Sequence, residues 1–135
     1  MRHAFAFVGA TALLAVSAIA CRRAAAPPPR VWRTMVHCPA GNQDSAHVTP
    51  PRDSIAVGDS IVWRTNGRAT SALGIALKDA NQAWPFAGAL PTGADSATTG
   101  HAVTRGRYPY KVTVTCRMPG NRDSTIVIDP DIIIY

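Results

Sequence analysis

The chain has 135 residues, with 14 Lys and Arg against 8 Asp and Glu, and hydrophobic residues make up 47% of it. This length suits one domain, and the content of large apolar residues excludes a chain that is disordered throughout. The 10 Gly and 11 Pro follow no period, which excludes a collagen-like chain.

The first twenty residues predict a secretory signal peptide, because Arg2 precedes an apolar run over residues 4–20. The run ends in Ala18-Ile19-Ala20-Cys21, which resembles the lipobox of bacterial lipoproteins, where the cysteine becomes the lipidated first residue. Two alternatives remain. Ordinary signal peptidase would leave Cys21 as a plain thiol, and an uncleaved run would act as an anchor.

The lipobox resemblance implies a protein of the cell envelope that is bound to the membrane through lipid and faces the periplasm or the exterior. In a host with two membranes, Arg22 after the cysteine resembles the signal for the outer membrane. Residues 22–30, RRAAAPPPR, predict an extended polyproline spacer. We therefore expect a signal peptide at 1–20, a tether at 21–33 and a domain at 34–135.

The basic charge lies mainly outside the predicted domain. Five of the 14 basic residues precede residue 34, so the domain has nine basic and eight acidic groups; the five are Arg2, Arg22, Arg23, Arg30 and Arg33. A nucleic-acid-binding domain concentrates positive charge on its folded surface. We expect no nucleic-acid partner.

Apolar and polar residues alternate from residue 34 onward, between frequent turn residues, which indicates an all-β domain. The predicted strands, in chain order, are 35–38, 53–57, 60–65, 71–78, 102–105, 108–116, 125–128 and 132–135. The segment 108–116 alternates most clearly, and we expect its even-numbered residues to face the core.

The least regular segment, residues 79–100, is predicted to be a long loop with one helical turn at 79–83. It contains Trp84 and Phe86. These aromatic residues either plug one end of the sandwich or form an exposed binding patch for a protein or small ligand.

The C-terminal segment 126–135 is strongly β-forming. We expect Asp129-Pro130-Asp131 to bend the chain so that residues 132–135 complete a sheet within the domain. The alternative is an edge strand that pairs with another chain.

Two motifs resemble cupredoxins: the segment 57–63, VGDSIVW, and the segment 106–110, GRYPY. The resemblance implies a Greek-key β-sandwich over about residues 48–128. An immunoglobulin-like sandwich is the alternative.

The copper ligands of that family are missing. A blue-copper site needs two His, a Cys thiolate and usually a Met. The segment 66–72 has no His, Val112 occupies the Cys position, and no His follows His101. The resemblance therefore implies the scaffold and not the activity.

The cysteines that remain after Cys21 are Cys38 and Cys116. An even pair in an exported protein predicts a disulfide. The alternative is a soft metal site for Cu(I) made by His37, Cys38, Cys116 and Met118.

Enzyme signatures are absent from the sequence, which also has no Glu. His37, His47 and His101 have no metal-ligand spacing and are expected to be surface residues. We expect a non-catalytic binding or envelope-associated module without a cofactor, the alternative being a copper-handling or electron-transfer protein.

Overall fold

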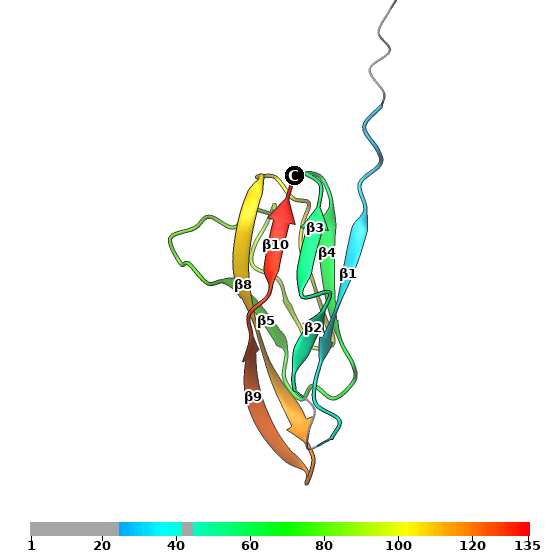
Figure 1. The fold of residues 1–135 in the computed structure, drawn as a ribbon, viewed down its shortest axis with the longest axis vertical. Helices are drawn as coiled ribbons and strands as arrows, with labels where there is room; N and C mark the ends of the chain where they lie inside the picture. Colours follow the sequence, from blue (N-terminus) through cyan, green and yellow to red (C-terminus); the bar gives the residue numbers. More distant parts are fainter. Residues whose placement is uncertain (1–24, 42–44) are drawn as a thin grey trace, which may run out of the picture.

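The computed structural model describes residues 25–41 and 45–135, and in these residues it contains ten strands and no helix (Figure 1). The described part of the chain has no helix that is long and apolar enough to cross a membrane. The signal peptide and Cys21 lie outside the described residues. The strands are β1 (Val31–His37), β2 (His47–Thr49), β3 (Arg52–Ile55), β4 (Ser60–Thr65), β5 (Leu73–Leu77), β6 (Thr92–Gly93), β7 (Ser96–Thr98), β8 (Gly106–Met118), β9 (Arg122–Ile128) and β10 (Asp131–Ile134).

The strands form two sheets. The first has the order β2-β1-β4-β7, with β1 parallel to β4. The second has the order β3-β10-β8-β5-β6, and β9 pairs with β8 outside this path. The apolar faces of both sheets contribute to one core cluster. The prediction of an all-β sandwich is confirmed.

Strand β8 follows the predicted alternation. Its even-numbered residues from 108 to 116 are all buried, whereas the odd-numbered ones are exposed or half-buried. The first part of β8 pairs with β10 and the second part with β9. One long strand therefore extends from the middle of the sheet to the tip of the β8–β9 hairpin.

The C-terminal strand completes a sheet within the domain, as predicted. Strand β10 pairs in parallel with β3 and antiparallel with β8. Both of its edges are occupied, so the alternative of pairing with another chain through β10 is not supported by this arrangement.

Strand β1 begins at Val31, three residues before the predicted domain boundary at 34. The reason is that the end of the predicted tether is bonded to the domain. Ser60 donates its backbone N–H to the Arg30 carbonyl over 2.9 Å, and Asp59 accepts from the Arg30 amide.

Two local predictions are wrong. Residues 102–105 form no strand, because their amides bond to loop carbonyls, such as Ala102 N–H to Asp59 and Val103 N–H to Pro85. Residues 79–83 form a turn and not a helix, since the Asp79 carboxylate accepts from the Asn81 amide. The predicted 79–100 loop also contains the short strands β6 and β7.

The centre of the core contains a tryptophan–tyrosine pair. Trp63 and Tyr110 are both 0% exposed, and the indole N–H of Trp63 donates to the Tyr110 hydroxyl over 3.0 Å. Burial raises the pKa of Tyr110 far above its ordinary value, so this hydroxyl stays protonated.

Asp53 of β3 is buried beside this pair. Its carboxylate accepts a hydrogen bond from the Thr34 hydroxyl, at 3.0 and 2.9 Å from its two oxygens. Burial raises the pKa of Asp53, and hydrogen bonds from Thr34 and Tyr110 only partly oppose that effect. The strand predicted at 53–57 begins at Asp53, and its alternation with Ile55 was the available sign of burial.

Candidate functional site

Two positions that the cupredoxin resemblance assigns to copper ligands are occupied by residues with a structural contact. Val112 is 0% exposed and packs in the core of β8. Asn66, at the start of the segment expected to hold the first His, uses its side chain to bind backbone. Its amide oxygen accepts from Cys38 N–H and its amide nitrogen donates to the Cys38 carbonyl. The Val112 side chain has no ligand atom, and the Asn66 side chain is committed to the backbone of Cys38.

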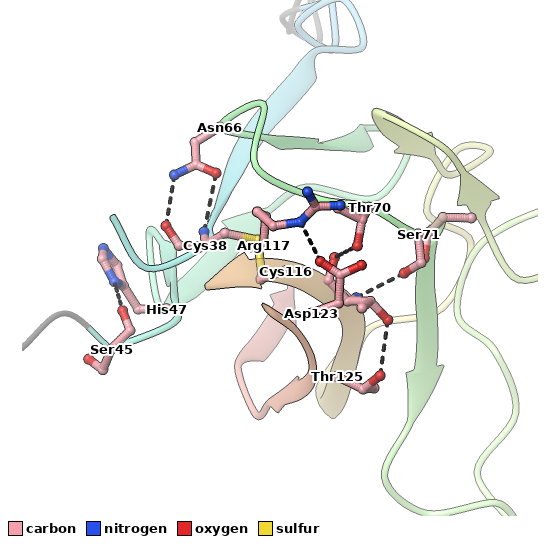
Figure 2. The surroundings of a disulfide bond; sticks show 12 residues. Cys38, Ser45, His47, Asn66, Thr70, Ser71, Cys116, Arg117, Asp123 and Thr125 are labelled. Carbon is pink, nitrogen blue, oxygen red and sulfur yellow. Dashed lines mark hydrogen bonds and ion pairs between the residues drawn. A yellow bond between two sulfur atoms is a disulfide. The ribbon is translucent and has the colours of Figure 1, made fainter. Parts of the chain in front are cut away.

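Cys38 and Cys116 form the predicted disulfide, with their Cα atoms 5.5 Å apart. Both residues are buried, at 3% and 0% exposure. The bond joins the end of β1 in the first sheet to β8 in the second, and Figure 2 shows Asn66 beside it. The two sulfurs of the alternative Cu(I) set are thus bonded to each other. That set also included His37 and Met118, which line different cavities.

A second pair that the sequence did not predict lies next to the disulfide. His37 of β1 is directly opposite His47 of β2, and their rings stack with centroids 4.5 Å apart and planes inclined by 11°. The pair was missed because residues 47–49 are too short and polar to predict as a strand. Among the described residues, no group of three or more His, Cys, Asp or Glu could hold a metal ion.

The predicted aromatic pair divides between the core and the surface. Phe86 is 3% exposed and belongs to the core, so it plugs the sandwich and is not available to a partner. Trp84 is half-buried and tilts against Phe86, with ring centroids 5.1 Å apart. The exposed-patch hypothesis therefore applies only to Trp84.

Trp84 lines a groove of about 280 Å³ on the flank of the second sheet, between the end of β5 and the loop that follows it. Leu90, at 48% exposure, lies on its rim. Gln82 is fixed at the groove because its side-chain amide donates to the Arg107 carbonyl over 3.2 Å. The full lining is Ala76, Leu77, Asp79, Ala80, Gln82, Trp84 and Leu90.

The indole nitrogen of Trp84 is buried and has no hydrogen-bond partner within the described residues. Arg68 Nε shares this property, but a guanidinium has four further N–H groups. An indole has one donor, and leaving it unpaired costs about 1–3 kcal/mol. Trp84 therefore lines an apolar groove and carries a buried donor that has no acceptor among the described residues. We name this site the Trp84 groove.

No protein-family model matches the chain, and no curated protein matches it. Among solved structures, the chain is similar to amicyanin from Paracoccus versutus, with a TM-score of 0.42 and 15% identity over 82% of this chain and 86% of that one. It is also similar to a reduced Cu(I) form of an amicyanin mutant at pH 4, with a TM-score of 0.40 and 12% identity over 84% and 87%. A reduced amicyanin mutant gives a TM-score of 0.40 and 13% identity over 75% and 80%.

Amicyanin is a cupredoxin, the family that the two sequence motifs resemble. Similarity at this level concerns the fold alone. It says nothing about ligands or activity in this chain, and the sandwich architecture is established by the strand pairing itself.

Proposed function

We propose that this protein is a non-catalytic binding module of the cell envelope, anchored by lipid at Cys21, which binds its partner through the Trp84 groove. The single observation that supports the binding role is that Trp84 lines an apolar groove while its buried indole N–H has no acceptor among the described residues. A partner that fits must present an apolar group next to a hydrogen-bond acceptor such as a carbonyl oxygen. A peptide with an apolar side chain and a small acylated ligand both meet this description.

The other two indoles support this argument by contrast. Trp63 donates to Tyr110, and Trp32 donates to Asp59 over 2.8 Å. Within the described residues, the fold thus provides an acceptor for each of these indoles and none for Trp84. An acceptor supplied by a ligand would recover the free energy that the unpaired donor costs.

The position of the groove also suits a tethered module. The N-terminal segment leaves the sandwich at the start of β1, at one end of the molecule, and the loop after β5 projects from its side (Figure 1). A partner bound on the flank therefore does not compete with the tether for the same surface. The extended spacer would hold that flank away from the lipid.

The binding role is tested by nuclear magnetic resonance of the full chain purified in detergent. The probe is N-acetyl-leucinamide at millimolar concentration, and N-acetyl-glycinamide is the matched control without the apolar side chain. We expect the leucine probe to shift the indole N–H signal of Trp84 and to leave those of Trp32 and Trp63 unchanged. No shift at Trp84, or equal shifts with both probes, would contradict the proposal.

The anchor is tested separately, by membrane fractionation and mass measurement of the mature N-terminus. We expect the protein in the membrane fraction with a lipidated Cys21, and Cys21→Ser in the soluble fraction or retained as an unprocessed precursor. A mature chain that begins at an unmodified Cys21 would favour ordinary signal peptidase. That outcome would reject the anchor and leave the Trp84 groove unaffected.

A further inference from the structure

The large apolar side chains that the described part of the chain leaves exposed are unevenly distributed. Two of the six lie elsewhere, Leu90 in the loop after β5 and Val127 on β9. The other four lie at the end of the sandwich from which the N-terminal segment departs, and they are 45–64% exposed: Val31, Val57, Val103 and Tyr135. Single exposed apolar residues are ordinary, whereas a group at one end of a domain indicates an interaction surface.

Backbone contacts with the turn between β3 and β4 bring these four residues to one end. Val57 donates its backbone N–H to the Tyr135 carbonyl over 3.1 Å, and Figure 1 shows the C-terminus at this end. Gly58 donates over 2.9 Å to the carbonyl of the residue before Val103. Val31 is paired with the first residue of β4, directly after the turn. We name this surface the tether end, made by residues 30–31, 56–59, 102–105 and 135.

The charged side chains of the tether end favour an anionic surface. Arg30 and Arg105 are exposed there. The one acidic side chain of these segments, Asp59, is buried, and its charge is compensated by three hydrogen-bond donors. Exposed apolar groups together with basic side chains match the interface of a bilayer that contains anionic headgroups, and a tyrosine such as Tyr135 suits a surface that is apolar on one side and wet on the other.

The length of the tether keeps this surface close to the lipid. Arg30 is fixed to the domain, because its carbonyl accepts from Ser60 and its amide donates to Asp59. It is nine positions after Cys21, a stretch that spans at most ~30 Å. Strand β8 alone, with 13 residues, is ~43 Å long. The tether is therefore shorter than the domain, and it holds the tether end at an effective concentration at which weak contacts with lipid suffice.

We propose that the tether end docks on the anionic surface of the membrane that carries the lipid anchor, with its exposed apolar side chains among the headgroups and its two arginines beside lipid phosphates. The inference rests on the lipid anchor of the proposed function and is independent of the Trp84 groove. Removal of apolar surface from water and attraction between opposite charges both stabilise the docked state. Docking fixes the orientation of the domain, so that the tip of the β8–β9 hairpin points away from the lipid (Figure 1).

The test is nuclear magnetic resonance of the lipidated mature chain in bilayer nanodiscs of phosphatidylcholine and phosphatidylglycerol. A lipid with a nitroxide beside its phosphate broadens the signals of groups close to the headgroups. We expect the methyl signals of Val31, Val57 and Val103 to broaden. The signals of Val127 should stay sharp, because it pairs opposite Thr113, roughly 23 Å along β8 from the start of that strand.

The double variant Val57→Ser and Val103→Ser separates docking from tethering, because it keeps the tether and removes apolar contact. We expect the ratio of docked to undocked chains, measured by the broadening at Val31, to fall on the order of tenfold. The matched control is Val127→Ser, the same change at an exposed valine outside the tether end, which should leave the ratio unchanged. Arg105→Gln should lower the ratio about fivefold with phosphatidylglycerol and leave it unchanged in phosphatidylcholine alone.

The thermal midpoint of each variant shows whether it is folded, and Tyr135→Ser replaces Val57→Ser if the latter unfolds. Equal broadening at Val31 and Val127, or broadening at Val31 that the double variant does not reduce, would overturn the docking and leave the anchor in place. A mature N-terminus without lipid, found by mass measurement, would reject the anchor and this proposal together.

Discussion

Asp59 and Trp84 mark two regions of this molecule in which buried hydrogen-bond donors meet opposite conditions. At the start of β1, the Asp59 carboxylate accepts from Arg30 N–H at 2.8 Å, from the Trp32 indole at 2.8 Å and from Ala56 N–H at 3.1 Å. In the Trp84 groove, the indole N–H has no acceptor among the described residues. In the first region every one of these donors has an acceptor. In the second region a donor is present and its acceptor is missing.

The pKa of Asp59 shows how fully the first region is satisfied. Asp59 is 5% exposed, and burial raises its pKa, yet hydrogen bonds from Trp32, Arg30 and Ala56 outweigh that effect and hold its pKa below 3.8. A buried charge with several donors is stable where it is. The comparison teaches that the completely bonded region serves the fold, whereas the incompletely bonded one is the place to look for a ligand.

The largest effect is expected when the disulfide, the strongest constraint on the fold, is removed. The double substitution Cys38→Ala and Cys116→Ala frees a closed loop with a sequence separation of 78. We expect it to lower the free energy of unfolding by about 4–5 kcal/mol. Urea unfolding at neutral pH measures this change. A loss below about 1 kcal/mol would show that the disulfide does not constrain the unfolded chain.

The next test removes the acceptor at the tether end. Asp59→Ala leaves three donors without a partner, and we expect a loss of about 3 kcal/mol in the free energy of unfolding. The matched control is Asp129→Asn, whose exposed ion pair with Lys78 at 3.3 Å should contribute less than about 1 kcal/mol. Equal losses in the free energy of unfolding of the two variants would mean that the hydrogen bonds of Asp59 contribute no more than an exposed ion pair.

The pH dependence of the free energy of unfolding also tests the contribution of Asp59. The folded pKa of Asp59 lies below its unfolded value, so its contribution is present above about pH 4 and is lost as the pH falls through the folded pKa. Asp131, whose pKa is lowered by Arg107, acts in the same direction. Asp53 acts in the opposite direction, because its folded pKa is raised and its contribution is lost as the pH rises.

We expect Asp59→Asn to show a weaker loss of stability between pH 4 and about pH 2 than the unchanged chain. Urea unfolding at a series of pH values measures it. An identical acid profile in the two proteins would mean that Asp59 does not titrate with folding.

The smallest expected effect is in the groove. Trp84→Phe removes an indole N–H that has no partner while keeping an aromatic ring against Phe86. We expect a change within about 0.5 kcal/mol in the free energy of unfolding, because the recovered cost of the unpaired N–H offsets the packing lost with the smaller ring. Thermal unfolding and the leucinamide titration together measure it. A loss near that of Asp59→Ala would show that Trp84 is a structural residue.

Much of the fold could be predicted, because it depends on local alternation. Residues 108–116 show their strand through a period-two apolar pattern and residues 60–65 through a short apolar run, and the disulfide was predicted from the two cysteines that follow Cys21. The edge strands β2, β6 and β7 could not be predicted. They are two or three residues long and owe their conformation to the strand beside them.

The candidate sites depend on contacts between residues far apart in the chain. Trp84 was noticed as an aromatic residue in a loop, but its unpaired nitrogen is visible only after folding. The His37–His47 pair needs the β1–β2 register, and the role of Asp59 needs Trp32, 27 residues away. Residue type alone indicated which residues to consider. Their contacts in the folded chain then showed which of them form a site.

The direction of β1 has a mechanical consequence. The strand leaves the tether at Val31, runs in parallel register with β4 over six residue pairs and ends beside Cys38. A pull on the tether therefore loads the β1–β4 hydrogen bonds together in shear, and these bonds must break at once before β1 can slide. Beyond them the covalent link between Cys38 and Cys116 stops the chain from extending, so a pull on the N-terminal segment reaches the disulfide before it unravels the second sheet.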